Sequence, residues 1–156
     1  MKLFLKIFVC LVLFLPAAQV SAEMPPPPYQ TLIIESQEGA KHYFDVELAI
    51  TPRQQQKGLM FRKSMPDDYG MMFFFGQESD QFFWMKNTLI PLDMIFIKKS
   101  GVIHHIHENA EPHSLKRIGS NGPVSAVLEV NGGLTRKLGI KPGDQVNHNF
   151  FNVAAD

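Results

Sequence analysis

Residues 92–107 read Leu-Asp-Met-Ile-Phe-Ile-Lys-Lys-Ser-Gly-Val-Ile-His-His-Ile-His. A leucine, a methionine and a phenylalanine alternate here with Asp93 and two isoleucines, which is the period of two that places successive side chains on opposite faces of a β-strand. Ser100-Gly101 then provides a turn into the next run, Val102 to His107. The stretch therefore predicts a β-hairpin.

Other parts of the chain also have the pattern of short strands, with turn residues between them. These segments are 29–36, 41–50, 71–75, 81–85, 123–130 and 145–151. Thr51, Pro52 and Gln54 form a helix-start signal for a short helix that ends near Gly58, and a second short helix is expected from an Asn131 cap to Gly139. The predicted fold class is mainly β: a single-domain sandwich or jelly-roll-like barrel of about seven to nine short strands with two short helices.

The N-terminal segment has the pattern of an export signal. Lys2 and Lys6 precede a run of nine apolar residues from Ile7 to Leu15, and Val20-Ser21-Ala22 offers small residues for cleavage. We expect a signal peptide at 1–22, a proline-rich spacer at 23–28 and a single β-rich domain at 29–156. The protein would then be exported, either periplasmic or secreted; an uncleaved N-terminal anchor is the alternative.

Composition removes several classes of function. The 156 residues include 15 basic and 15 acidic side chains, and no run of Lys or Arg provides the positive footprint of a nucleic-acid-binding protein. The single cysteine cannot form a disulfide within the chain, and it lies in the predicted signal. A mature domain would therefore have no thiol nucleophile or Cys-based metal site.

The most unusual stretch is the bend between Phe82 and Asp93. It places the only tryptophan, Trp84, close to Lys86, Asn87, Thr88 and Asp93. Asp93 shares its predicted strand face with isoleucines, so its carboxylate needs an ionic or hydrogen-bonding partner, and Lys86 is the nearest cation in sequence. Either these polar residues only brace the hairpin, or at least one of Trp84, Lys86 and Asp93 contacts a ligand.

Histidines form a second group of candidates. His105 and His107 share a strand face, and Glu111 follows four residues after His107, which is the ligand order of a cupin-type metal motif. No second motif of that kind follows. We therefore predict no metal site and no cofactor, and keep His105, His107 and Glu111 as candidates for a zinc, iron or copper site.

Several motifs resemble a known family, domain of unknown function 192. They are Gly70-Met71-Met72-Phe73-x-Phe75, Phe83-Trp84-Met85-Lys86-Asn87-Thr88 with Pro91-Leu92-Asp93, Ile106-His107-Glu108-Asn109-Ala110 with Pro112, Val127-Leu128-Glu129-x-x-x-Gly133, and Gly139-Ile140-x-x-Gly143-Asp144. The resemblance implies a mostly β fold of the sandwich or jelly-roll kind and brings no established activity, substrate or cofactor. The polar residues at its motif positions are Arg62, Trp84, Lys86, Asn87, Asp93, His107, Glu108 and Glu129.

The leading functional hypothesis is an exported domain that binds a small polar ligand such as a saccharide, or a cell-envelope component. Trp84 would provide a stacking face, with hydrogen bonds from Lys86, Asn87 and Asp93. We expect no nucleic acid and, once the signal is removed, no membrane among its partners. A hydrolase-like enzyme that uses Asp93 or Glu129 with Lys86 or His107 is one alternative. A metal module and a partner-binding domain with an apolar patch are the others.

Overall fold

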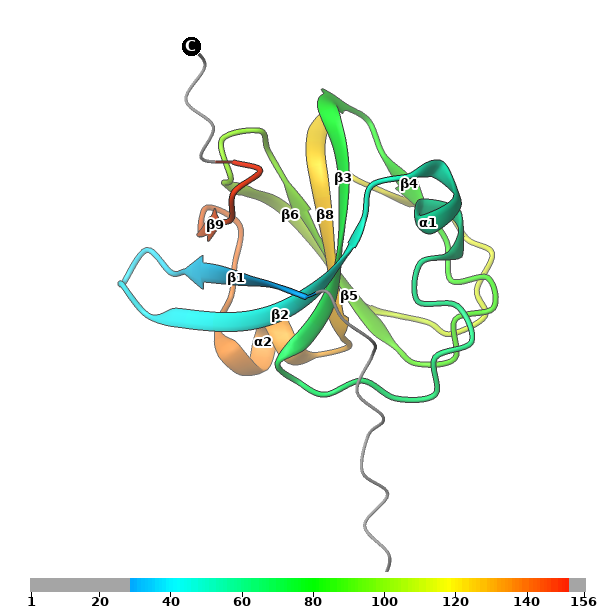
Figure 1. The fold of residues 1–156 in the computed structure, drawn as a ribbon. Coiled ribbons are helices and arrows are strands. Elements are labelled where there is room, and N and C mark those ends of the chain that lie inside the picture. Colours follow the sequence, from blue (N-terminus) through cyan, green and yellow to red (C-terminus); the bar gives the residue numbers. More distant parts are fainter. Residues whose placement is uncertain (1–28, 152–156) are drawn as a thin grey trace, which may run out of the picture.

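A seven-stranded sheet forms the frame of the protein in the computed structural model, which describes residues 29–151 (Figure 1). Its strand order is β6-β5-β8-β3-β2-β1-β9. These strands are β1 (Gln30–Glu35), β2 (Lys41–Ala49), β3 (Tyr69–Ser79), β5 (Leu92–Ile97), β6 (Ile103–Ala110), β8 (Val124–Asn131) and β9 (Gln145–Asn147). A separate two-stranded sheet pairs β4 (Phe82–Phe83) with β7 (Ile118–Gly119), and the helices are α1 (Pro52–Lys57) and α2 (Leu134–Leu138). The predicted mainly β fold class with two short helices is confirmed.

The sheet curls toward a barrel. Neighbouring strands are antiparallel except β2 and β3, which are parallel and are joined by a crossover that contains α1. At the far edge β9 pairs with β1, and an isolated bridge joins Val102 to Gln145. The last strand thus approaches the beginning of β6, so the two ends of the curled sheet lie near each other.

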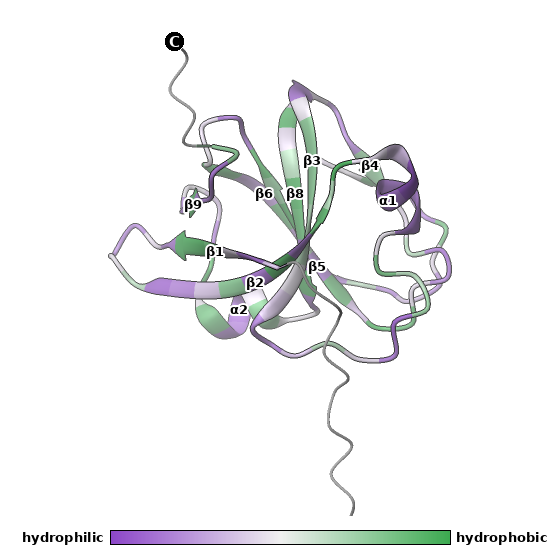
Figure 2. Cartoon of the chain, viewed as in Figure 1, coloured by the Kyte–Doolittle hydropathy of each residue, from purple (hydrophilic) through white to green (hydrophobic). Residues whose placement is uncertain are grey.

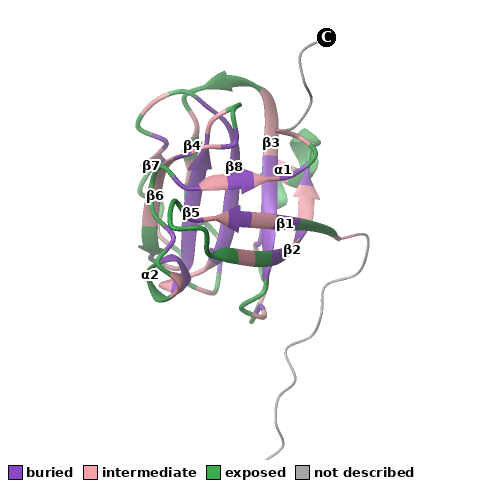
Figure 3. Cartoon of the chain, turned by 90° about the vertical axis from the view of Figure 1, so that its left-hand side faces the viewer, coloured by how far each residue is buried: buried purple, intermediate pink, exposed green. Residues whose placement is uncertain are grey.

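The inner face of the curled sheet holds one apolar cluster. All seven strands contribute to it, and α2 packs on it through Leu134. Its strand residues are Leu32, Ile34, Phe44, Val46, Met72, Ile95, Ile97, Ile103, Ala126, Leu128, Val130 and Val146. The central strands β5 and β8 are buried along almost their whole length, whereas buried residues of β1 and β2 alternate with partly exposed ones (Figure 3).

The outer face of the sheet carries a second apolar cluster, which loops cover. The strands contribute five of its residues, namely Met71, Phe73, Met94, Phe96 and Val127. Three residues of the connecting loops pack on them, namely Leu59, Met65 and Met85. Helix α1 lies beside this cover with no buried residue of its own, and it is hydrophilic along its length (Figure 2). The outer face is therefore an irregular layer rather than a second sheet, which leaves room for a cavity.

The structure confirms the predicted features that depend only on residues close together in the sequence. The capping box of α1 forms as expected, since the Thr51 hydroxyl accepts from the Gln54 N–H and the Gln54 side chain accepts from the Thr51 N–H. The hairpin of β5 and β6 forms as well, and its residues alternate between the faces as predicted. Gly139 ends α2 in the left-handed region, at a φ of 72°.

Three expectations need correction. Asn131 does not cap α2, because its side-chain amide donates to the Met65 carbonyl and to Asp67, and Gly133 takes the N-cap position. The segment 81–85 is not a buried strand: only Phe82 and Phe83 are extended, and Phe82 is 56% exposed. The final strand stops at Asn147 instead of reaching Phe151.

The predicted signal peptide at 1–22 and the spacer at 23–28 lie outside the described residues. Within residues 29–151, no helix has both the length and the apolar character needed to cross a membrane.

Candidate functional site

A cavity of about 320 Å³ opens on the outer face of the sheet. Five aromatic residues line it, together with the end of α1 and the loop that follows. The aromatic residues are Phe73, Phe75, Phe82, Phe83 and Trp84. The volume, and a lining that combines aromatic rings with a few polar side chains, are typical of a site for a small molecule.

Glu129 lies on the floor of this cavity. On β8 it pairs in register with Met71 of β3 on one side and with Met94 of β5 on the other, so thioethers flank its carboxylate. The residue is only 5% exposed, and within the described part of the chain its carboxylate forms no hydrogen bond or ion pair. Burial raises the pKa of this carboxyl from 4.5 to about 8.

The bend that carries Asn87 and Thr88 is held by backbone hydrogen bonds to two other loops. The Asn87 carbonyl accepts from the Phe61 N–H at 2.8 Å, and the Thr88 carbonyl accepts from the His113 N–H at 3.2 Å. Asn87 adopts a left-handed conformation with a φ of 57°, which asparagine tolerates better than most residues. The side chain of Thr88 is buried and lines the cavity. The bend therefore supplies a fixed part of the wall.

Trp84 is an exposed part of the cavity wall, and Lys86 lies beside its ring. Trp84 is 50% exposed, and the Lys86 ammonium lies 5.3 Å from the centroid of its ring. This distance is within the range of a cation–π interaction. Lys86 itself is exposed, and it does not pair with Asp93 as the sequence suggested.

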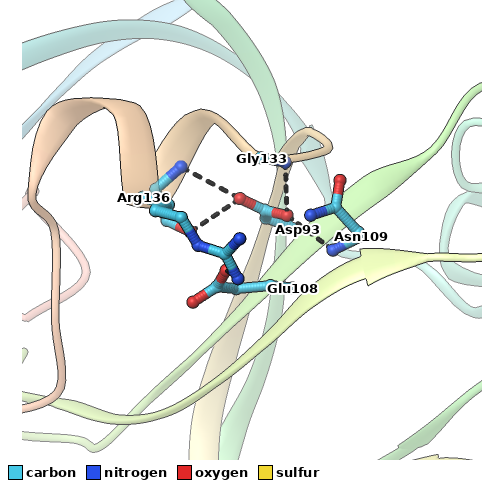
Figure 4. A network of polar contacts seen from close by, with 6 residues as sticks. Asp93, Glu108, Asn109, Gly133 and Arg136 are labelled. Carbon is cyan, nitrogen blue, oxygen red and sulfur yellow. Dashed lines mark hydrogen bonds and ion pairs between the residues drawn. The ribbon is translucent and has the colours of Figure 1, made fainter.

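Asp93 belongs to a different part of the molecule, where it connects β5 to α2 (Figure 4). Its carboxylate accepts from the backbone N–H groups of Asn109, Gly133 and Thr135 at 2.8, 2.8 and 2.9 Å, and from the Thr135 hydroxyl at 2.6 Å. The side chain is completely buried, so solvent does not reach it. The expectation that Asp93 contacts a ligand or pairs with Lys86 is therefore wrong: backbone donors already satisfy both of its oxygens.

Three motif residues remain: Glu108 and Arg62 form ion pairs, and His107 lies on the outer face of the sheet near the cavity. Glu108 pairs with Arg136 at 2.5 Å beside the Asp93 network (Figure 4).

Arg62 pairs with Glu47 at 2.6 Å, and Glu47 lies opposite Met71 on β2. His107 lies opposite Met94 on β6. One row of the outer face thus reads His107, Met94, Glu129, Met71 and Glu47, and His107 is two strands away from Glu129, or about 10 Å.

The histidine candidates do not form a metal-binding cluster among the described residues. Within residues 29–151, no three side chains of the His, Cys, Asp or Glu type are placed to hold a metal ion, and this covers His105, His107 and Glu111. The Asn121 side-chain amide donates to Nε2 of His105, and His104 donates through its own Nε2 to the Asn121 carbonyl. Burial, and next the neighbouring His107 and His104, lower the pKa of His105. Asn121 is thus hydrogen-bonded to the candidate His105 and to the neighbouring His104.

Residues 33–148 match the family model described as "DUF192: Uncharacterized ACR". The chain belongs to this family. The resemblance drawn from its motifs is thereby confirmed, and the matched range of the DUF192 domain contains both the cavity and the Asp93 network.

Two solved structures are similar to this DUF192 domain. One is a protein from Sinorhizobium meliloti, a suggested transcription regulator, with 43% identity and a TM-score of 0.76 over 80% of this chain and 97% of that one. The other is a protein of unknown function from Novosphingobium aromaticivorans, with 38% identity and a TM-score of 0.75 over 85% of this chain and 99% of that one. No functionally curated protein matches the chain.

Sequence reasoning identified part of the cavity and missed the rest. It selected Trp84, Thr88 and Glu129, which all line the cavity, but it did not connect them with the end of α1, where Lys57, Gly58 and Leu59 form the opposite wall. It also did not assign Phe73 and Phe75 to a site. The available signal was the capped helix ending at Gly58, yet its position over β3 depends on the parallel crossover.

Proposed function

We propose that this DUF192 domain is an exported binding protein whose cavity takes one small polar organic molecule. The observation that carries the proposal is Glu129: an ionisable carboxyl, buried and without a partner among the described residues, at the floor of an open cavity with aromatic walls. Burying such a group costs free energy unless something compensates it. A ligand that hydrogen-bonds or ion-pairs with this carboxyl would provide the compensation.

Trp84 supports the same proposal from the mouth of the cavity. Its indole ring is half exposed although it belongs to the cavity wall, and an exposed aromatic face is what a flat or apolar part of a ligand stacks on. The ligand would therefore combine a polar group that reaches Glu129 with a body that contacts the aromatic wall. A saccharide ring has both features, as do other small polar compounds.

A hydrolase of the two-carboxylate type has less support. Such chemistry needs two carboxyl groups about 5–9 Å apart across one cavity. Glu129 is the acidic residue that lines this cavity, whereas Asp93 projects to the opposite face of the sheet. A carboxyl with a pKa of about 8 could act as a general acid, but a second catalytic group beside it does not emerge from the described residues.

Isothermal titration calorimetry and thermal-shift screening with small polar compounds, including cell-envelope sugars, test the proposal. Trp84→Ala should lower the affinity of any binder at least tenfold, because it removes one wall of the cavity. Tyr43→Ala is the matched control: Tyr43 is an aromatic residue on β2 with a comparable exposure of 59%, and it does not line the cavity. A binder whose affinity is unchanged by Trp84→Ala would show that its site lies elsewhere.

A further inference from the structure

The charge state around Glu129 indicates what kind of polar group the cavity accepts. Strands β3 and β5 present Met71 and Met94 to the carboxylate, and neither thioether is a hydrogen-bond donor. The cavity side presents Phe73 and Thr88. The Thr88 hydroxyl is directed to the Lys86 carbonyl, at 3.5 Å, and not to Glu129. The amides of Gln55, Gln56 and Gln81 also line the cavity, but Gln55 donates to the Ala49 and Phe74 carbonyls and Gln81 donates to the Ser79 hydroxyl. Among the described residues, no donor is hydrogen-bonded to the Glu129 carboxylate.

The charged groups nearest to this floor are already paired or lie at the mouth. Farther along the same row, Glu47 and Arg62 neutralise each other, and His107 lies two strands away. From the α1 side, Lys57 lines the cavity near its exposed end. No cation of the described residues reaches the carboxylate itself, so a ligand would have to bring the positive charge.

The walls favour a cation as well. Aromatic rings carry negative charge on their faces, and several rings around one space attract ammonium groups. Five aromatic residues line this cavity, and two of their rings already have a cation over one face: Lys86 over Trp84, and Arg117 at 3.9 Å over Phe82. Aromatic walls combined with a single buried carboxylate form the chemical environment in which an organic ammonium group loses its hydration shell at least cost.

We propose that the cavity binds an organic cation, with an alkylammonium head enclosed by the aromatic residues and Glu129 as its counter-ion. This inference rests on the proposed function and specifies its ligand class. An anionic ligand would be repelled by the ionised Glu129 carboxylate, so it would have to bind while Glu129 stays protonated. A neutral saccharide would leave the carboxylate without a compensating charge, although its hydroxyl groups could still donate hydrogen bonds to the carboxylate.

A choline titration compared with 3,3-dimethylbutan-1-ol tests this proposal. The two molecules have the same shape, but only choline carries a fixed positive charge. Because Trp84 is the only tryptophan of the chain, its intrinsic fluorescence reports occupation of the cavity directly. We expect choline to bind at least tenfold more tightly than the neutral alcohol, and acetate not to bind. Equal affinities for choline and the alcohol would overturn the inference.

Proton release gives a second readout. Since the pKa of Glu129 is about 8, binding of a fixed cation at pH 7 should release close to one proton, which calorimetry in buffers of different ionisation enthalpy detects. The affinity for choline should rise about tenfold per pH unit between pH 6 and pH 8 and then level off. An affinity that is independent of pH would exclude Glu129 as the counter-ion.

Variants separate the roles of the charges. Glu129→Gln keeps the shape of the side chain and should lower choline affinity at least tenfold while changing that of the neutral alcohol less than twofold. Glu35→Gln, on β1 and away from the cavity, is the matched control and should change neither. Lys86→Met should leave choline binding unchanged or strengthen it, because an ammonium group that competes for the Trp84 ring is removed. A tenfold loss of choline affinity would contradict the inference, since removing a like charge should not weaken the binding of a cation.

The two levels of the proposal fail in different ways. If saccharides or other neutral compounds bind in a Trp84-dependent manner and choline does not, the ligand class is wrong and the binding function stands. If neither choline nor any other compound of the screen changes the Trp84 fluorescence or the melting temperature, both proposals are wrong.

Discussion

Asp93 and Glu129 lie on the neighbouring strands β5 and β8, but their side chains project to opposite faces of the sheet. Asp93 pairs in register with Val130, and the next pair is Met94 with Glu129, one residue later on β5 and one residue earlier on the antiparallel β8. Because side chains alternate along a strand, this single step sends one carboxylate to the inner face and the other to the outer face. The first has four hydrogen-bond donors, and the second has an open cavity.

Asp93→Ala should destabilise the fold strongly. The substitution leaves the N–H groups of Asn109, Gly133 and Thr135 without their acceptor in a buried place, and it removes the link between β5 and α2. We expect the free energy of unfolding to fall by ~3–5 kcal/mol, as measured by urea denaturation. Asp67→Ala is the control, since its pair with Lys137 is exposed and should contribute under ~1 kcal/mol. A loss below ~1 kcal/mol for Asp93→Ala would contradict the structural role.

Glu129 should make the protein less stable as pH rises. Its folded-state pKa is about 8 and its ordinary value is 4.5, so between these values the folded state holds a proton that the unfolded state has lost. The free energy of unfolding should therefore decrease by up to about 1.4 kcal/mol per pH unit within this window. In Glu129→Gln this slope should disappear, and the variant should be more stable than the parent at pH 8 to 9. Urea denaturation of both proteins at pH 5, 6.5, 8 and 9 measures the difference.

The contrast between Asp93 and Glu129 also explains how far the sequence could predict this molecule. The alternation in residues 92–97 and the capping box at Thr51 depend on neighbours within a few positions, and both were predicted correctly. The partners of Asp93 are 16, 40 and 42 positions away, so the nearest cation in sequence, Lys86, was a misleading choice. Pairing at such distances is decided by strand order, which the local pattern does not contain.

The cavity could not be predicted from the sequence for the same reason, because it also depends on long-range strand pairing. The sequence identified Glu129 only as a polar motif position, because the face to which it points depends on the register between β8 and its two neighbours. The opposite wall comes from the crossover after the parallel strand β2, and a parallel pair was not predicted. Three segments far apart in the chain therefore had to be placed before the cavity could be recognised.

The ion pair between Arg62 and Glu47 should contribute more to stability than the exposed pairs. Its N–O distance is 2.6 Å, and both side chains are only about a fifth exposed, whereas Lys137 and Asp67 are more than half exposed. We expect Arg62→Met to lower the free energy of unfolding by ~1–2 kcal/mol, between the values for surface and buried pairs. Lys137→Met should change it by less than ~0.5 kcal/mol. Equal effects in thermal denaturation would show that partial burial does not strengthen the pair.

Gly70 sets the distance at which β3 can approach Glu129. A Cβ atom at this position would lie 2.7 Å from the backbone carbonyl oxygen of Glu129 and 3.1 Å from the side chain of Leu128, closer than van der Waals contact allows. Since Gly70 has no left-handed conformation to preserve, the cost of Gly70→Ala comes from this overlap alone. We expect a loss of ~1–3 kcal/mol in the free energy of unfolding, together with weaker ligand binding because β8 must shift under the cavity.

Gly39→Ala is a control for the general effect of losing a glycine. A Cβ atom at Gly39 meets no atom within 4 Å, but the residue has a φ of 87°, so the cost of the substitution is conformational strain without a change in binding. If Gly70→Ala lowers stability and leaves the cavity's affinity unchanged, the approach of β3 does not position Glu129.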